Sequence, residues 1–142
     1  MPTLLGLCKM EIPGTVEGYD FGSYLRAGGK APGDGAALIS CVAPFGEWER
    51  RRGGREFRGI RTSRYTYVRD LNGPWLLFDN QGDPYQTNNL VNLPAQQLLQ
   101  AELEAALSAK LRATRDEFLP ADDYIRRWSY TVDANGTVPY TH

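Results

Sequence analysis

The sequence predicts an α+β domain in which a small antiparallel sheet of about four strands packs against one long C-terminal helix. Residues 65–70 alternate with a period of two, and an Asn72-Gly73 pair separates them from the apolar run at residues 75–78, which is typical of a β-hairpin. Residues 94–113 carry leucines at a spacing of four, which predicts an amphipathic helix. A helix that covers one face of an antiparallel sheet is typical of the α+β class.

The N-terminal third of the chain contains an apolar segment, a loop and the first strand. Residues 1–8, MPTLLGLC, are interpreted as a short helix that starts abruptly, because no N-cap residue precedes it. Residues 27–35 are dense in Gly and Pro and predict a loop. The near-continuous apolar run at residues 36–42 predicts the first strand, which we expect to be central in the sheet.

The hairpin at residues 65–79 has a defined turn. Asn72 and Gly73 take positive φ more readily than other residues, which predicts a type I′ turn. Pro74 can open the second strand, where the missing N–H is least needed. Residues 79–83 predict a polar turn, since Asp and Asn hydrogen-bond the nearby backbone and the spacing is not that of a calcium loop.

The helix predicted at residues 94–113 has an apolar face, formed by Leu99, Leu103, Leu107 and Leu111. Ala95 and Ala106 are expected to join this face. Its burial against the sheet would stabilise the helix, because most helical stability comes from such packing. A second, short helical segment is expected to begin at Ala121 or Asp122.

Composition excludes several classes of function. The 142 residues carry a formal net charge of −1, so no overall field favours nucleic acid or an anionic membrane, and the apolar runs are shorter than the roughly 20 residues that span a bilayer. Cys8 and Cys41 are expected to be buried thiols, with a single disulfide as the alternative, and no Cys/His spacing is typical of zinc. His142 is the only histidine and the last residue; we expect a frayed terminal side chain, which excludes a Ser-His-Asp triad.

One loop allows two interpretations. A tryptophan stands close to four arginines there: Trp48, Arg50, Arg51, Arg52 and Arg55. The simpler interpretation is a solvated, mobile loop, as most charge runs are. The alternative is a substrate-binding loop, because guanidinium groups bind sulfate or phosphate oxygens and Trp48 can stack on a sugar or aryl ring.

Several short motifs follow one another along the chain: RGIRT at residues 58–62, RYTYV at 64–68, WLLFD at 75–79, Asp83-Pro84, and NNL at 88–90. Their order resembles the C-terminal subdomain of the type I sulfatases, the alkaline-phosphatase-like sulfuric ester hydrolases that include arylsulfatases and N-sulfoglucosamine sulfohydrolases. This chain has Gln86 where the family usually has Glu. PTLLGL at residues 2–7 is similar to the segment that closes the large catalytic domain, so the resemblance covers almost the whole chain.

The resemblance implies two parts: residues 1–30 as the tail end of the catalytic domain and a linker, and residues 31–142 as the C-terminal subdomain. It also implies calcium and a formylglycine made from cysteine or serine, both expected in a catalytic domain missing from this chain. Residues 41–45, CVAPF, lack the arginine of the family motifs C-x-P-S-R and C-x-A-x-R. We therefore expect no catalytic residue and no metal ligand in the chain.

We accordingly expect a C-terminal sulfatase fragment that packs on the catalytic domain, helps to shape the substrate cleft and is inactive alone. The alternative is a stand-alone module that binds a sulfated or anionic saccharide through Trp48 and the arginines of residues 50–55. Leu4, Leu5 and Leu7 would be exposed without a catalytic domain, which predicts self-association or partial disorder before about residue 30. The sequence leaves the compartment undetermined, although the family is often periplasmic, secreted or lysosomal.

Overall fold

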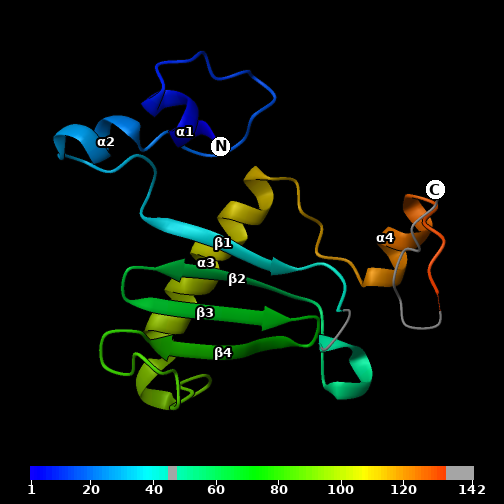
Figure 1. Ribbon diagram of the computed structural model, residues 1–142. Helices are drawn as coiled ribbons and strands as arrows, with labels where there is room; N and C mark the ends of the chain where they lie inside the picture. The colour runs from blue at the N-terminus through cyan, green and yellow to red at the C-terminus, as the bar shows by residue number, and fades with distance from the viewer. Residues whose placement is uncertain (45–47, 134–142) are drawn as a thin grey trace. The chain divides into compact units, whose positions relative to one another are not determined.

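The computed structural model describes residues 1–44 and 48–133, and the chain divides into two compact units, Met1–Ala36 and Ala37–His142. Within the described residues, the first unit contains short helices, and the second contains the sheet and the remaining helices (Figure 1).

The regular structure of the first unit consists of α1 (Pro2–Leu7) and α2 (Gly22–Ala27). The side chain of Thr3 ties α1 to the loop before α2, because its Oγ1 donates to the Tyr19 carbonyl at 3.3 Å and accepts from the Phe21 N–H at 3.1 Å. The helix α1 confirms the predicted apolar segment, and no side chain caps its N-terminus.

Four strands form one sheet in the order β1-β2-β3-β4, and Figure 1 shows that their directions alternate. The strands are β1 (Ala36–Cys41), β2 (Phe57–Thr62), β3 (Tyr65–Asp70) and β4 (Gly73–Asp79). The antiparallel sheet of the predicted α+β class is therefore confirmed. The expectation that the first strand is central was wrong, because β1 pairs on one side only and none of its residues is fully buried.

The turn between β3 and β4 also differs from the prediction. Asp70 pairs with Gly73, so Leu71 and Asn72 link the strands. A type I′ turn needs positive φ at both linking residues, and neither has it; only Gly73 does, at 128°. The Asp70 Oδ1 atom accepts the Asn72 N–H at 2.7 Å, so a side chain closes the turn. The positive φ that favours glycine is therefore needed at Gly73, one residue after Asn72.

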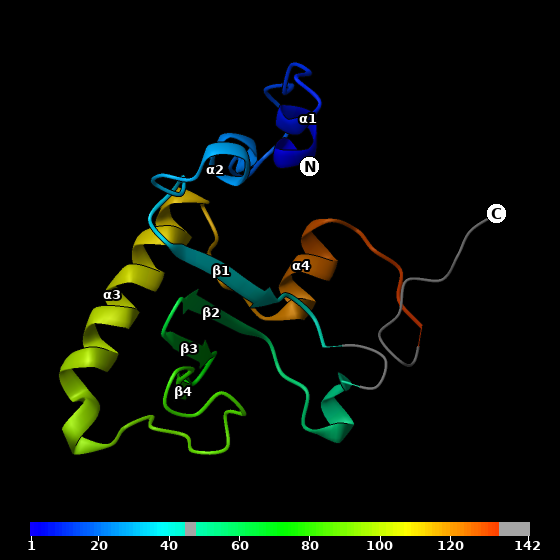
Figure 2. The same ribbon diagram turned by 60° about the vertical axis from the view of Figure 1, so that its left-hand side comes forward.

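Helix α3 (Gln97–Ala113) lies along one face of the sheet in both Figure 1 and Figure 2, after the short 3-10 turn η3 (Pro94–Gln96). The long helix predicted at residues 94–113 is thereby confirmed. Sheet and helices together bury the apolar core of the described residues: Ile60, Tyr67, Val68, Leu77, Phe78, Leu103, Leu107, Leu111, Ala121 and Tyr124. The expectation that Ala95 and Ala106 join this face was wrong: both are exposed, and Ala95 lies in η3, before α3 begins.

Helix α4 (Ala121–Arg127) packs at the start of β2. Its first residue is one of the two expected, and its N–H donates to Glu56 Oε1 at 2.8 Å. Glu56 is almost fully buried, so a carboxylate from before β2 holds the N-terminus of α4 in place of a local cap.

The polar turn after β4 is confirmed. Asp79 Oδ1 accepts the backbone N–H groups of Gln81 and Gly82 at 3.1 and 3.3 Å, and Asp83 Oδ2 accepts the N–H of Asn88 at 2.7 Å. These carboxylates satisfy backbone donors, which is the role expected of Asp in turns.

The NNL motif covers the outer edge of β4. Asn89 Oδ1 accepts the Leu77 N–H at 2.9 Å, and its Nδ2 donates to the Trp75 carbonyl at 3.0 Å. The Leu90 N–H donates to the Leu77 carbonyl at 2.8 Å. The motif thus satisfies backbone groups that an edge strand would otherwise expose.

Candidate functional site

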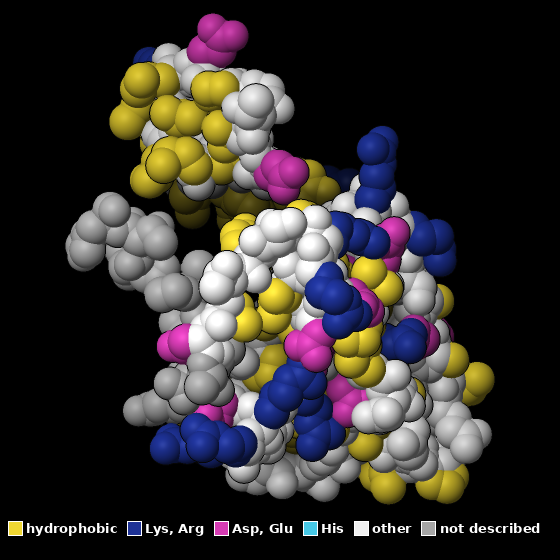
Figure 3. All heavy atoms as spheres, turned by 90° about the vertical axis from the view of Figure 1, so that its right-hand side faces the viewer, with side chains coloured by type: hydrophobic (Ala, Val, Ile, Leu, Met, Phe, Trp, Pro, Cys, Tyr) yellow, Lys and Arg dark blue, Asp and Glu magenta, His cyan; other side chains and the backbone are white. Residues whose placement is uncertain are grey.

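The arginine-rich loop leads from β1 to β2 and contains one turn of 3-10 helix, η2 (Arg50–Arg52). It belongs to the face shown in Figure 3, where basic and acidic side chains lie next to one another with hydrophobic side chains between them. Gly53 follows the turn in the left-handed region, with φ 90°. A Cβ on Gly54 would lie 1.7 Å from the Trp48 carbonyl oxygen, so the loop closes only with glycine there.

Two of the arginines are paired with buried carboxylates. Arg50 Nη2 donates to Glu56 Oε1 at 2.5 Å, and Arg55 Nη1 donates to Asp70 Oδ2 at 2.9 Å. The side chains of Glu56 and Asp70 are 3% and 9% exposed, whereas those of Arg50 and Arg55 are 53% and 44% exposed. The carboxylates therefore orient the guanidinium groups and balance their charge.

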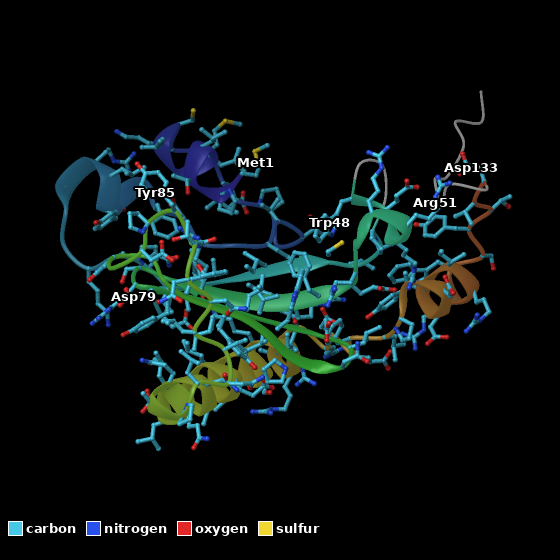
Figure 4. The ribbon with its side chains drawn as sticks, turned by 90° about the horizontal axis from the view of Figure 1, so that it is seen from below. Met1, Trp48, Arg51, Asp79, Tyr85 and Asp133 are labelled. Carbon is cyan, nitrogen blue, oxygen red and sulfur yellow. The ribbon has the colours of Figure 1, made fainter. Side chains whose placement is uncertain are left out.

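The other two arginines of the loop share one acid. Arg51 Nη2 lies 2.9 Å from Glu49 Oε2, and Arg52 Nε lies 3.4 Å from Glu49 Oε1. Both arginines are largely exposed, and pairs of this kind contribute about 0–1 kcal/mol. Figure 4 shows Arg51 at the end of the sheet opposite to Asp79.

Aromatic side chains from two strands complete the loop's surroundings. Trp48 stacks on Trp75 of β4, with ring centroids 6.4 Å apart and planes inclined by 23°, and Phe57 of β2 lies 6.2 Å from Trp75. The Arg55 guanidinium carbon lies 4.5 Å from the centroid of Trp75. Arg55 is thus held by an ion pair and a cation–π contact together.

A groove of about 440 Å³ opens beside this cluster, and its lining includes Arg50, Arg55, Glu56, Asp70, Leu71 and Asn72. Of the five residues suggested by the sequence, Arg50 and Arg55 line the groove, whereas Trp48, Arg51 and Arg52 do not. Trp48 lies near the lining, because it stacks on Trp75 and the Trp75 ring contacts Arg55. The sequence analysis missed Asp70 and Trp75, because they lie on the far strands of the hairpin and no local spacing connects them to the loop.

The two cysteines do not form a nucleophilic centre. Both are free thiols; Cys8 is exposed and Cys41 is half-buried, so the expectation of buried thiols was wrong for Cys8, which follows the last turn of a short helix. Burial, together with the charge of Glu56, raises the pKa of the Cys41 thiol above 9.0 against the opposing effect of Arg58. The raised pKa disfavours the thiolate form that a nucleophilic cysteine requires.

Metal and membrane features were sought in residues 1–44 and 48–133. There, no three His, Cys, Asp or Glu side chains come close enough together to hold a metal ion. Over the same ranges, no helix has the length and apolar character needed to cross a membrane. His142 lies outside the described residues.

No family model matches the sequence. The chain is, however, 40% identical over 144 residues to an ulvan-active sulfatase from Formosa agariphila, and the alignment covers 99% of this chain and 27% of that protein. The chain thus spans about a quarter of the length of this relative.

Solved structures agree with the sequence match. The structure of BT4656 in complex with its substrate D-glucosamine-2-N,6-O-disulfate superposes with a TM-score of 0.66 at 25% identity, covering 82% of this chain and 24% of that one. The structure of BT1596, a 2-O GAG sulfatase, gives a TM-score of 0.68 at 25% identity, covering 94% and 26%. This chain therefore has the sequence and the fold of a C-terminal sulfatase subdomain.

Proposed function

We propose that this chain is the supporting C-terminal subdomain of a sulfate ester hydrolase, that it packs on a catalytic domain and helps to shape the substrate cleft, and that it is not catalytic alone. The observation that carries the proposal is 40% identity to a sulfatase across 99% of this chain, which covers only 27% of that relative. The proposal assigns calcium and formylglycine to the catalytic domain. Because the matched region is only about a quarter of the relative, the comparison favours a subdomain of a larger enzyme over a stand-alone binding module.

The N-terminal residues supply the contact with the catalytic domain in this proposal. Residues 1–30 would be the end of that domain and a linker, and residues 31–142 the subdomain. Leu4, Met10 and Leu25 are 61%, 60% and 62% exposed, which is unusual for large apolar side chains gathered in one short segment. An apolar partner surface would remove them from water.

The chemistry of the cysteines supports an inactive chain. Cys41 is followed by Val42 and Ala43 in a sequence without the family's arginine, and the raised pKa of its thiol disfavours the nucleophilic thiolate. We expect the purified chain to release no sulfate from an aryl sulfate, with or without calcium. Turnover that survives replacement of both Cys8 and Cys41 would overturn this part of the proposal.

The packing role has its own test. The part of the Formosa sulfatase outside the matched region would be produced alone and mixed with this chain, and complex formation measured by sedimentation velocity. We expect a one-to-one complex with more sulfate release than the truncated relative shows alone. Two species that sediment independently at micromolar concentration would contradict the packing role.

A further inference from the structure

We propose that the groove beside η2 holds a sugar ring of the substrate through neutral acceptors such as hydroxyl groups, and that it does not hold the sulfate group. This inference rests on the proposed function and assigns one part of the substrate to one place in the chain. It differs from the interpretation of the loop as an anion site, and the difference follows from charge.

The guanidinium groups of the groove are already neutralised. Arg50 and Arg55 each have a carboxylate at 2.5 or 2.9 Å, and those carboxylates are almost completely buried. A sulfate brought to either arginine would approach an existing ion pair, whose net charge is zero and whose field falls off quickly. The arginines therefore have little electrostatic preference for an anion.

Hydrogen-bond donors nevertheless remain available at the rim. A guanidinium group has five N–H donors, and among residues 48–133 the hydrogen bonds of Arg50 and of Arg55 each use a single Nη atom. Both groups are about half exposed and are held in place, Arg55 by Asp70 and by the Trp75 ring. These guanidinium N–H donors are held in place, and buried carboxylates balance their charge. They are therefore suited to the neutral oxygen atoms of a polyhydroxylated ring.

An aromatic cluster next to the groove supplies a second feature of a sugar site; its tryptophans do not line the groove, but the Arg55 guanidinium of the lining lies over the Trp75 ring. Trp48 is 43% exposed and stacks on Trp75, and the Trp75 ring also makes the cation–π contact with Arg55. An aromatic face beside polar donors matches a pyranose ring, which has apolar C–H faces and a polar edge. The groove volume of about 440 Å³ lies within the range of roughly 300–1,000 Å³ common for small-ligand sites.

The test separates sugar recognition from anion recognition. A panel of neutral tetrasaccharides of hexose and pentose units, each also prepared in chemically sulfated form, would be titrated into the full chain and followed by tryptophan fluorescence at low and at high salt. We expect at least one neutral member to bind, and to bind about as tightly as its sulfated form, with little dependence on salt because no net charge is neutralised. Binding confined to sulfated members and abolished by salt would overturn the inference, and so would no binding at all.

Variants locate the binding. Asn72→Ala and Trp48→Ala change exposed side chains at the groove and next to it, and each should weaken binding by about tenfold while thermal unfolding stays close to that of the unchanged chain. Arg52→Ala is the matched control, since it removes an arginine of the same loop outside the groove, and it should leave binding unchanged. Equal loss with Arg52→Ala would contradict the assignment. Complex formation with the truncated sulfatase is measured separately, so failure of this inference is distinct from failure of the proposed function.

Discussion

At the scale of single residues, Arg58 organises the junction between the sheet and the C-terminal segment. Its side chain is 1% exposed, and Nε donates to Asp116 Oδ2 at 2.5 Å while Nη1 donates to the carbonyls of Cys41 and Phe57. Nη2 donates to the other oxygen of Asp116 at 3.2 Å. The first arginine of the RGIRT motif is therefore a buried structural cation, which must keep its partner to remain favourable.

Replacement of Asp116 by Asn tests this ion pair through its dependence on pH. Burial opposes ionisation of Asp116, but hydrogen bonds from Arg58, the Phe118 N–H and Tyr124 outweigh it and hold its pKa below 3.8. A carboxyl with a lowered folded pKa stabilises the fold above its unfolded pKa, and this contribution is lost as the pH falls through the folded value. We expect Asp116→Asn to lower the free energy of unfolding by about 3 kcal/mol at neutral pH, and by less at acid pH, because the contribution of the carboxylate is lost as the pH falls through its lowered folded pKa. Urea titrations at both pH values measure this, and equal stability at neutral pH would contradict it.

At the scale of elements, α3 is stabilised by the face it presents to the sheet. Leu107 is fully buried in the middle of that face, whereas Leu98, in the first turn of the same helix, is 85% exposed. Tyr67 adds a polar contact, since its hydroxyl donates to Glu104 Oε2 at 2.8 Å, and burial followed by this hydrogen bond raises the pKa of the tyrosine. Arg69 Nη1 donates to the other oxygen of Glu104 at 2.7 Å, so the helix is fixed by an apolar stripe and by two contacts to Glu104 beside it.

Two leucine substitutions compare the faces of α3 directly. Leu107→Ala should lower the free energy of unfolding by about 3 kcal/mol, because it removes buried methyl groups and leaves a cavity. Leu98→Ala makes the same chemical change on the solvent side and should shift stability by less than about 0.5 kcal/mol. Chemical denaturation of both variants provides the measurement, and comparable losses in the two would show that the packing face is misassigned.

At the scale of the whole molecule, the two units differ in how well they bury their apolar residues. The unit Ala37–His142 contains the ten buried hydrophobic residues of the described core and eight exposed large ones. The much shorter unit Met1–Ala36 contains none of that core and exposes seven: Met1, Leu4, Leu7, Met10, Tyr19, Tyr24 and Leu25. Surfaces of this kind associate in water. This concentration of exposed apolar side chains in the first unit supports the partner contact that the proposed function assigns to it.

Self-association of the isolated chain follows from that surface. We expect sedimentation equilibrium to show dimers or larger species at micromolar concentration, and the double substitution Leu4→Glu with Leu25→Glu to return the chain to a monomer. Leu98→Glu is the control, because it places a glutamate at an exposed leucine of the other unit. A monodisperse monomer in the unchanged chain would contradict the prediction.

Local patterns in the sequence were sufficient for most elements. Alternation located β3, the leucine repeat located α3, and the Asp-rich turn after β4 followed from side chains that bond their own neighbours. The position of β1 in the sheet and the type of the β3–β4 turn were not predictable in this way. An apolar run does not show whether its strand lies at the centre or at the edge of the sheet. An Asn-Gly pair likewise does not show that the Asp70 side chain accepts the Asn72 N–H.

The sequence by itself determined the class of the fold, the helix that covers the sheet and the kinship with sulfatase C-terminal subdomains, because periodicity and short motifs are properties of neighbouring residues. The tertiary structure alone decided which arginines of the loop are neutralised and which buried arginine is structural. Arg55 meets Asp70 across 15 positions, and Arg58 meets Asp116 across 58. Charge balance at such distances in the chain depends on how strands and helices pack, so it emerges only in the folded molecule.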